Sequence, residues 1–98
     1  MQVKCGIDII EIDRIKEAIE TTKGEFINRV YTENEIQYCE SKNNMKYQHY
    51  AARFAAKEAA FKAISEEFEK YEITWKDIEI TSNETGKPKV EILNKKIP

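Results

Sequence analysis

The chain has 98 residues, charged side chains at 35% of its positions and a net charge of -2. This length suits one small domain, so we expect a single domain over residues 1–98. A basic excess or basic run is absent, which argues against a nucleic-acid-binding surface. The sequence shows neither a signal peptide nor an apolar stretch of membrane-spanning length, so we expect a cytoplasmic protein without a membrane partner.

The first predicted element is a strand over residues 3–10, where β-branched residues dominate. Asp8 interrupts this run on the face that it shares with Gly6 and Ile10. An edge strand with one face in water would make Asp8 an ordinary solvated residue. A functional role is the alternative, and Gly6 would let another group approach the backbone closely.

Helices are predicted next, from their capping signals. Asp13 is the expected N-cap of the first helix, and Thr32 with Glu35 forms a capping box for a later one. The expected segments are helix over residues 13–22, a turn at 23–24, renewed helix, a helix over 32–41, a spacer at 42–44 and a long alanine-rich helix.

The last predicted element is a hairpin with period-two alternation, formed by residues 78–81 and 90–93 around a turn at 84–87. The predicted fold class is therefore α+β, with a small antiparallel sheet packed against the long alanine-rich helix and shorter helices.

The long helix carries charges within its apolar face. At roughly 100° per residue, Lys57 lies inside an aromatic stripe, Glu58 lies at one edge with Lys62 just beyond it, and Arg53 flanks the other edge. Such departures from the apolar pattern are typical of functional sites. The alternative is a solvated helix with a Glu58–Lys62 ion pair at i,i+4 and a lysine at 57 that reaches water along its aliphatic stem.

Asp8 and Glu58 together suggest a metal site. Mg²⁺ prefers one or two protein carboxylates plus phosphate oxygens and waters, and nearby lysines would neutralise phosphate charge. By chemistry alone we expect phosphoryl transfer on a Mg²⁺-bound pyrophosphate.

Five segments resemble the holo-[acyl-carrier-protein] synthase family of 4′-phosphopantetheinyl transferases in order and spacing. The most specific feature is the Gly-Ile-Asp strand followed some fifty residues later by the Lys-Glu helix. The segments are residues 6–10, 26–29, 32–35, 53–59 and 86–88.

The resemblance implies transfer of the 4′-phosphopantetheine arm of coenzyme A to a serine of an apo acyl carrier protein, releasing adenosine 3′,5′-bisphosphate. It implies that Asp8 and Glu58 bind Mg²⁺ and that Lys62 lies at the pyrophosphate. The serine of the partner would be deprotonated by a metal-bound water or by a carboxylate such as Asp8 or Glu58. His49 has no acid–base partner in the sequence and is interpreted as a helix-surface residue.

The resemblance also assigns contacts to the nucleotide and to protein partners. Arg53 matches a contact on the 3′-phosphate side, Gly86 and Pro88 match a turn that lines the nucleotide pocket, and Lys57 belongs to the same motif. Arg14 matches a residue that docks the carrier protein, with surface solvation as the alternative. The family forms homotrimers with active sites between subunits, so a homotrimer is expected.

The sequence departs from the family in two places. No glycine turn follows Lys62, so the helix is expected to continue, and the family's C-terminal strands are absent, as in a truncated or reduced form. A non-catalytic relative that binds coenzyme A or a carrier protein is therefore the second hypothesis, and a purely structural module is the third.

Overall fold

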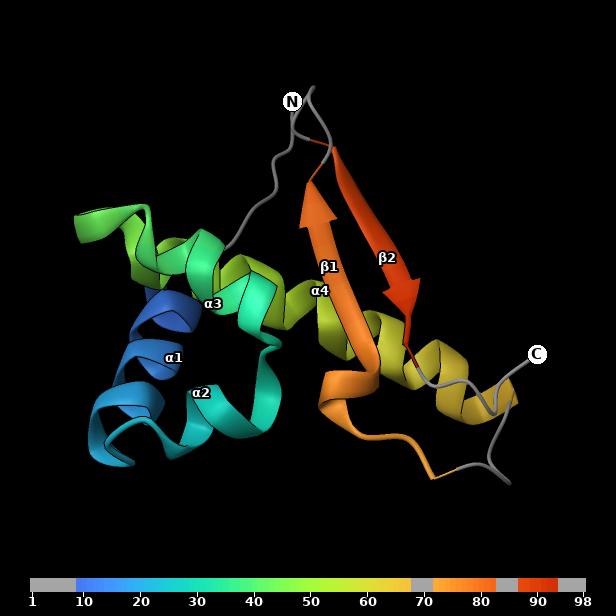
Figure 1. Cartoon of the computed structure of the whole chain (residues 1–98). Helices are drawn as coiled ribbons and strands as arrows, with labels where there is room; N and C mark the ends of the chain where they lie inside the picture. Colours follow the sequence, from blue (N-terminus) through green and yellow to red (C-terminus); the bar gives the residue numbers. More distant parts are fainter. Residues whose placement is uncertain (1–8, 68–71, 83–86, 94–98) are drawn as a thin grey trace.

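Among the described residues, four α-helices precede a β-hairpin, which confirms the α+β class predicted from the sequence (Figure 1). The structure is a computed structural model, and it describes residues 9–67, 72–82 and 87–93. The α-helices are α1 (Ile9–Thr21), α2 (Glu25–Val30), α3 (Glu33–Glu40) and α4 (Lys46–Glu67). The remaining elements are two short 3-10 helices, η1 (Asn43–Met45) and η2 (Trp75–Asp77), and the strands β1 (Ile78–Ser82) and β2 (Pro88–Ile92).

The start of α1 corrects two predictions. The strand expected over residues 3–10 is wrong at Ile9 and Ile10, which are helical, and its earlier part lies outside the described residues. Asp13 is not an N-cap, because the helix begins four residues before it. The helix buries Ile15 and Ile19, which lie one turn apart on one face, and this packing outweighs the strand preference of the β-branched run.

The turn and caps between the next helices are as predicted. Gly24 has a φ of 94°, a left-handed conformation that side chains disfavour, and α2 begins directly after it. The capping box is also confirmed, because the Thr32 hydroxyl accepts from the Glu35 N–H at 3.3 Å and the Glu35 carboxylate accepts from the Thr32 N–H at 2.8 Å. Helix α3 then ends at Glu40 with Ser41 as its C-cap.

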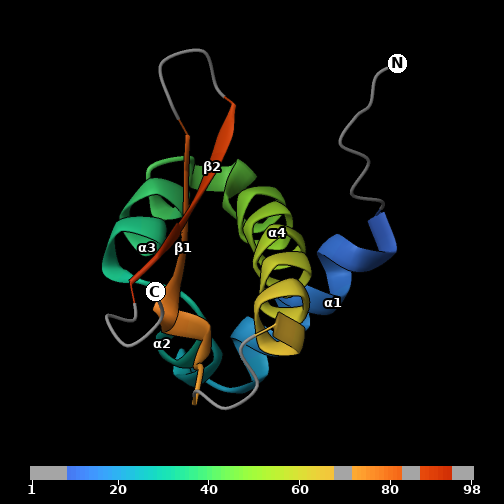
Figure 2. The ribbon, with the colours of Figure 1, turned by 90° about the vertical axis from the view of Figure 1, so that its right-hand side faces the viewer.

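The predicted hairpin is confirmed as an antiparallel pair of β1 and β2, with Ile78 opposite Ile92 and Ile80 opposite Val90. Strand β1 lies against α3 and α4 (Figure 2), so both of its isoleucines are only 1% exposed. Strand β2 lies outside this contact and its residues are exposed. Only the first strand of the sheet therefore contributes to the core.

The main core lies among α1, α2, α3 and α4. The Tyr31 and Tyr50 rings pack edge to face with centroids 4.9 Å apart, and the Tyr31 hydroxyl donates to the Tyr50 carbonyl at 2.8 Å. Its buried residues are Ile15, Ile19, Val30, Tyr31, Cys39, Tyr50 and Ala51. Helix α4 touches α1, α3 and β1, so its faces meet three different environments.

Candidate functional site: the α1–α4 groove and the buried face of α4

A cavity of about 280 Å³ lies between α1 and α4. Glu58, the predicted metal ligand of α4, is exposed at this cavity, and Glu11 and Arg14 face it from α1. The full lining is Glu11, Arg14, Ile15, Ala51, Phe54, Ala55 and Glu58. Carboxylates from two helices thus line one solvent-accessible groove.

Arg14 lies at the junction of this cavity with a neighbouring one of about 440 Å³ that extends toward Thr21 and Phe26. Its guanidinium donates to the Glu11 carboxylate at 2.7 Å, and both side chains are largely in water. Exposed pairs of this kind contribute about 0–1 kcal/mol, so Arg14 can exchange partners at little cost.

Glu58 and Lys62 occupy the outer edge of the α4 face, as the helical periodicity predicts. They are one turn apart, and both are exposed. The Glu58–Lys62 ion pair that was the alternative explanation is absent from the described residues. These two charges therefore remain available to a ligand.

Lys57 occupies the opposite environment. Its side chain is 0% exposed, so the alternative that it reaches water along its stem is wrong. The ammonium donates to the Glu35 carboxylate at 2.8 Å and to the Ile78 carbonyl. Burial lowers the pKa of Lys57, and the hydrogen bond and charge of Glu35 oppose that lowering. In this structure the donors of Lys57 point inward, and its predicted contact with a cofactor stays a prediction.

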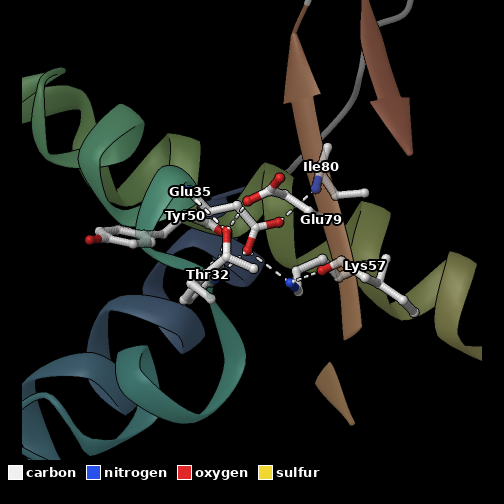
Figure 3. A network of polar contacts seen from close by, with 8 residues as sticks. Thr32, Glu35, Tyr50, Lys57, Glu79 and Ile80 are labelled. Atoms are coloured by element: carbon white, nitrogen blue, oxygen red, sulfur yellow. Dashed lines mark hydrogen bonds and ion pairs between the residues drawn. The ribbon is translucent and has the colours of Figure 1, made fainter. Parts of the chain in front are cut away.

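Glu35 joins three elements at one carboxylate (Figure 3). One oxygen accepts from the Thr32 N–H and from Lys57, both at 2.8 Å, and the other accepts from the Ile80 N–H at 2.7 Å. The Thr32 hydroxyl also donates to Glu79. Every oxygen of the buried Glu35 carboxylate thus has a donor, as a buried charge requires.

Arg53 lies one turn before Lys57 and is 7% exposed. Its guanidinium carbon lies 4.1 Å above the Tyr38 ring, and one terminal nitrogen donates to Ser82 at 3.3 Å. Its Nε is buried and has no hydrogen-bond partner in the part of the chain that the structure describes. Such a group is rarely left unpaired in native proteins, so it marks a place where an acceptor is missing.

Tyr38 has two further basic neighbours, Lys42 with its ammonium 4.7 Å from the ring centroid and His49 with ring centroids 5.5 Å apart. His49 is half-buried, and burial, then Lys42 and Arg53, lower its pKa. The positive charges of Arg53 and Lys42 therefore lie close to this ring.

Of the remaining predicted site residues, the structure describes only Pro88. Asp8 and Gly86 lie outside the described residues, so their distances to Glu58 and Arg53 stay predictions. Pro88 is the exposed first residue of β2. A proline fits there because a strand's first residue need not donate to the ladder.

Comparison with known proteins decides the family. The model of the 4′-phosphopantetheinyl transferase superfamily matches residues 4–98. The chain belongs to this superfamily. Its relatives include the holo-[acyl-carrier-protein] synthase of Ruminiclostridium cellulolyticum, 50% identical over 97% of this chain and 70% of the relative. The holo-[acyl-carrier-protein] synthase of Clostridium tetani is 52% identical over 94% of the chain and 70% of the relative. The one from Thermodesulfovibrio yellowstonii is 44% identical over 94% and 80% respectively. The resemblance stated from the sequence is confirmed.

The groove carries carboxylate groups on both of its walls. Glu58 and Glu11 supply carboxylate oxygens, the ligand type that Mg²⁺ prefers. No group of three or more metal-ligating side chains is present in the described ranges. That is compatible with Mg²⁺, which takes one or two carboxylates and completes its shell with phosphate and water.

None of the described helices is long and apolar enough to cross a bilayer.

Two residues of the site were missed by sequence reasoning. Glu35 was read only as a capping-box residue, although it is also the partner of Lys57. A buried lysine requires an acidic partner, but the sequence contains many glutamates and does not identify which one. Glu11 was missed because α1 was expected to begin after it, and helix formation from Ile9 is what places it beside Arg14.

Proposed function

We propose that this chain transfers the 4′-phosphopantetheine group of coenzyme A to a serine of an apo acyl carrier protein, with Mg²⁺, and releases adenosine 3′,5′-bisphosphate. The observation that carries the proposal is identity of about half to relatives named holo-[acyl-carrier-protein] synthase, over nearly the whole chain. The exposed Glu58 in the α1–α4 groove supports it. We place the reaction in the cytoplasm.

In the proposed reaction, the serine oxygen of the carrier protein forms a bond to the phosphorus that bears pantetheine. The bond from that phosphorus to the bridging pyrophosphate oxygen breaks, and adenosine 3′,5′-bisphosphate leaves with the electron pair. The serine proton passes to a carboxylate, for which Asp8 and Glu58 are the candidates. The nucleophile belongs to the partner.

Asp8 and Glu58 would hold Mg²⁺ beside the pyrophosphate. When bound, the ion neutralises charge on the pyrophosphate and polarises the attacked phosphorus. Lys62, one turn beyond Glu58 on the outer edge of α4, offsets charge on the departing phosphate or protonates it. The exposure of both side chains on this edge supports these roles.

Arg53, Lys57, Gly86 and Pro88 would form the nucleotide side of the site. The buried Nε of Arg53, which lacks an acceptor among the described residues, supports a role in binding the 3′-phosphate. Lys57 would contribute its charge from the interior, because its donors already bond to Glu35 and Ile78.

Arg14 would dock the acidic carrier protein. Its exposed position at the junction of the two cavities, with only a surface ion pair to release, supports this role. We also propose a homotrimer, since a domain of this size gains buried area by association.

A second candidate, a non-catalytic relative that binds coenzyme A or a carrier protein, is favoured by one observation. Helix α4 continues to Glu67, where the resemblance places a glycine turn near the phosphate. This continuation confirms the sequence-based expectation of a longer helix, and it changes the backbone next to Lys62.

Mass spectrometry of an apo acyl carrier protein, incubated with this chain, coenzyme A and Mg²⁺, tests the proposal. We expect a mass gain of one phosphopantetheine group that requires all three components. Calorimetric binding of coenzyme A without any mass gain would establish the second candidate in place of the enzyme. Absence of both would leave only a structural module.

A further inference from the structure

Two side chains form hydrogen bonds with the backbone of β1 on the edge that faces away from β2. The Leu93 N–H donates to the Asp77 carbonyl, so residues 77 and 93 form a hydrogen-bonded pair of the antiparallel ladder. Because hydrogen-bonded and non-hydrogen-bonded pairs alternate along such a ladder, the next hydrogen-bonded pairs are 79–91 and 81–89. The backbone groups of Ile78 and Ile80 therefore face away from β2. Lys57 donates to the carbonyl of Ile78, and Glu35 accepts from the N–H of Ile80.

The Glu35–Lys57 pair thus occupies the position of a neighbouring strand's backbone. It joins the first turn of α3, the middle of α4 and the inner edge of β1 through one carboxylate and one ammonium, as Figure 3 shows. Both side chains are fully buried. A pair of this kind is often no more stabilising than apolar residues of the same volume, so its role is better sought in the geometry that it imposes.

That geometry acts directly on the groove. Successive residues of an α-helix point about 100° apart, so the direction of Lys57 determines the direction of Glu58. Lys57 is held toward α3 and β1, and Glu58 then faces α1 and lines the cavity with Arg14. A rotation of α4 that released Lys57 would also turn Glu58 away from the groove.

We propose that Glu35 is a positioning residue of the transferase site, acting through Lys57 to set the rotation of α4 and hence the direction of the Glu58 carboxylate. This inference rests on the proposed function. Glu35 touches neither the groove nor any substrate atom in this account, and its effect passes entirely through the buried ammonium.

The test compares three variants with the wild type at a temperature where each is folded by circular dichroism. Glu35→Asp keeps the charge but shortens the side chain, so one carboxylate cannot reach both Lys57 and Ile80. The double variant Glu35→Leu with Lys57→Met removes both charges together, which avoids leaving either charge buried alone. Tyr31→Phe is the matched control, because it removes a buried hydrogen bond to α4 at Tyr50 without touching the pair.

Two quantities are measured: Mn²⁺ affinity in the presence of coenzyme A, by electron paramagnetic resonance, and kcat and KM for transfer. For both Glu35 variants we expect Mn²⁺ affinity to fall about 10- to 100-fold, the usual effect of disturbing a residue that orients a metal ligand. We expect kcat to fall with it and KM for the carrier protein to stay the same. Tyr31→Phe should lose stability and keep both quantities.

The positioning role is overturned if folded Glu35→Asp has the same Mn²⁺ affinity and kcat as the wild type. The proposed function stays intact in that case, provided that the wild type transfers the group normally. If Glu35→Asp unfolds, the double variant replaces it. Wild-type Mn²⁺ affinity and kcat in the folded double variant would then overturn the positioning role. A wild type that neither binds Mn²⁺ with coenzyme A nor transfers the group would remove the proposed function, and the positioning role with it.

Discussion

The two edges of the same face of α4 use their charges in opposite ways. On the inner edge, Arg53 and Lys57 are buried, and their donors go to Ser82, Glu35 and Ile78. On the outer edge, Glu58 and Lys62 are exposed, and no ion pair joins them within the described residues. Only a rotation of about 100° separates Lys57 from Glu58.

The comparison shows that a charge within an apolar helix pattern has two distinct meanings. A buried charge needs a protein partner to compensate for lost hydration, so its partner defines the fold. An exposed charge on a cavity wall costs little to keep and remains open to a ligand. Substitutions on the inner edge should therefore lower stability whatever they do to transfer, and those on the outer edge should change transfer with little effect on stability.

The largest effect is expected on the outer edge, for Glu58→Ala. Loss of a proposed Mg²⁺ ligand, and with it of the ion that offsets the developing charge, should lower kcat/KM for transfer by at least about 10²-fold. The free energy of unfolding should change by less than about 0.5 kcal/mol, because the side chain is exposed. A mass-spectrometric transfer assay and urea unfolding measure the two quantities.

Glu66→Ala is the matched control for that variant, since Glu66 is another exposed glutamate of α4. It should leave both quantities near their wild-type values. If Glu58→Ala is destabilised, and transfer falls only in proportion to the unfolded fraction, the outer edge is structural as well.

The inner edge is tested by Lys57→Met. This substitution leaves the buried Glu35 carboxylate without its ammonium, and we expect a loss of about 3–5 kcal/mol in the free energy of unfolding. Lys62→Met, on the exposed edge of the same helix, should change it by less than about 0.5 kcal/mol. Equal losses in the two variants, measured by urea unfolding, would contradict the division of the face.

The place of each charge around α4 was predictable, but the burial of Arg53 and Lys57 and the identity of their partners were not. Helical periodicity placed Lys57 inside the apolar stripe and Glu58 at its edge, because that geometry depends only on position in the helix. The partner Glu35 lies 22 residues away, and a contact between α3 and α4 depends on how the helices pack. The capping box and the hairpin were predicted correctly because both are local signals.

The N-terminal region shows where local reasoning fails. The β-branched residues at Ile9 and Ile10 indicated a strand, yet α1 already includes them, since burial of Ile15 and Ile19 favours a helix. The convergence of Asp8 with Glu58 depends on this segment, and it stays a prediction because Asp8 lies outside the described residues.

Alkaline pH should weaken the core on the inner side of α4. Burial raises the pKa of Cys39 to about 12 and raises the pKa values of Tyr31 and Tyr50 above their usual range. Above the unfolded values of about 8.5 for cysteine and 10 for tyrosine, the folded state holds more protons than the unfolded state. The free energy of unfolding should then fall with rising pH, by about 1.4 kcal/mol per pH unit for each group.

Tyr31→Phe isolates one of these groups. Above pH 10.5 its free energy of unfolding should fall less steeply than that of the wild type, by about 1.4 kcal/mol per pH unit. Lys57, whose lowered pKa acts with the opposite sign, no longer contributes above its unfolded pKa of about 10.4. Parallel slopes for the two proteins would contradict the burial of the Tyr31 hydroxyl.

A smaller effect on transfer is expected for Arg14→Ala, at the far wall of the groove. Only an exposed ion pair with Glu11 is lost, so the free energy of unfolding should change by less than about 1 kcal/mol. If Arg14 docks an acidic carrier protein, KM for that protein should rise several-fold while kcat stays constant. Steady-state kinetics at low salt measures both, and an unchanged KM would argue for a solvated residue.

Calorimetric titration of coenzyme A, with and without Mg²⁺, into the wild type, Glu58→Ala and Glu66→Ala tests the role of the outer edge most directly. We predict that Mg²⁺ tightens coenzyme A binding for the wild type and for Glu66→Ala, and that this dependence disappears in Glu58→Ala. The same Mg²⁺-dependent titration in all three proteins would contradict the account.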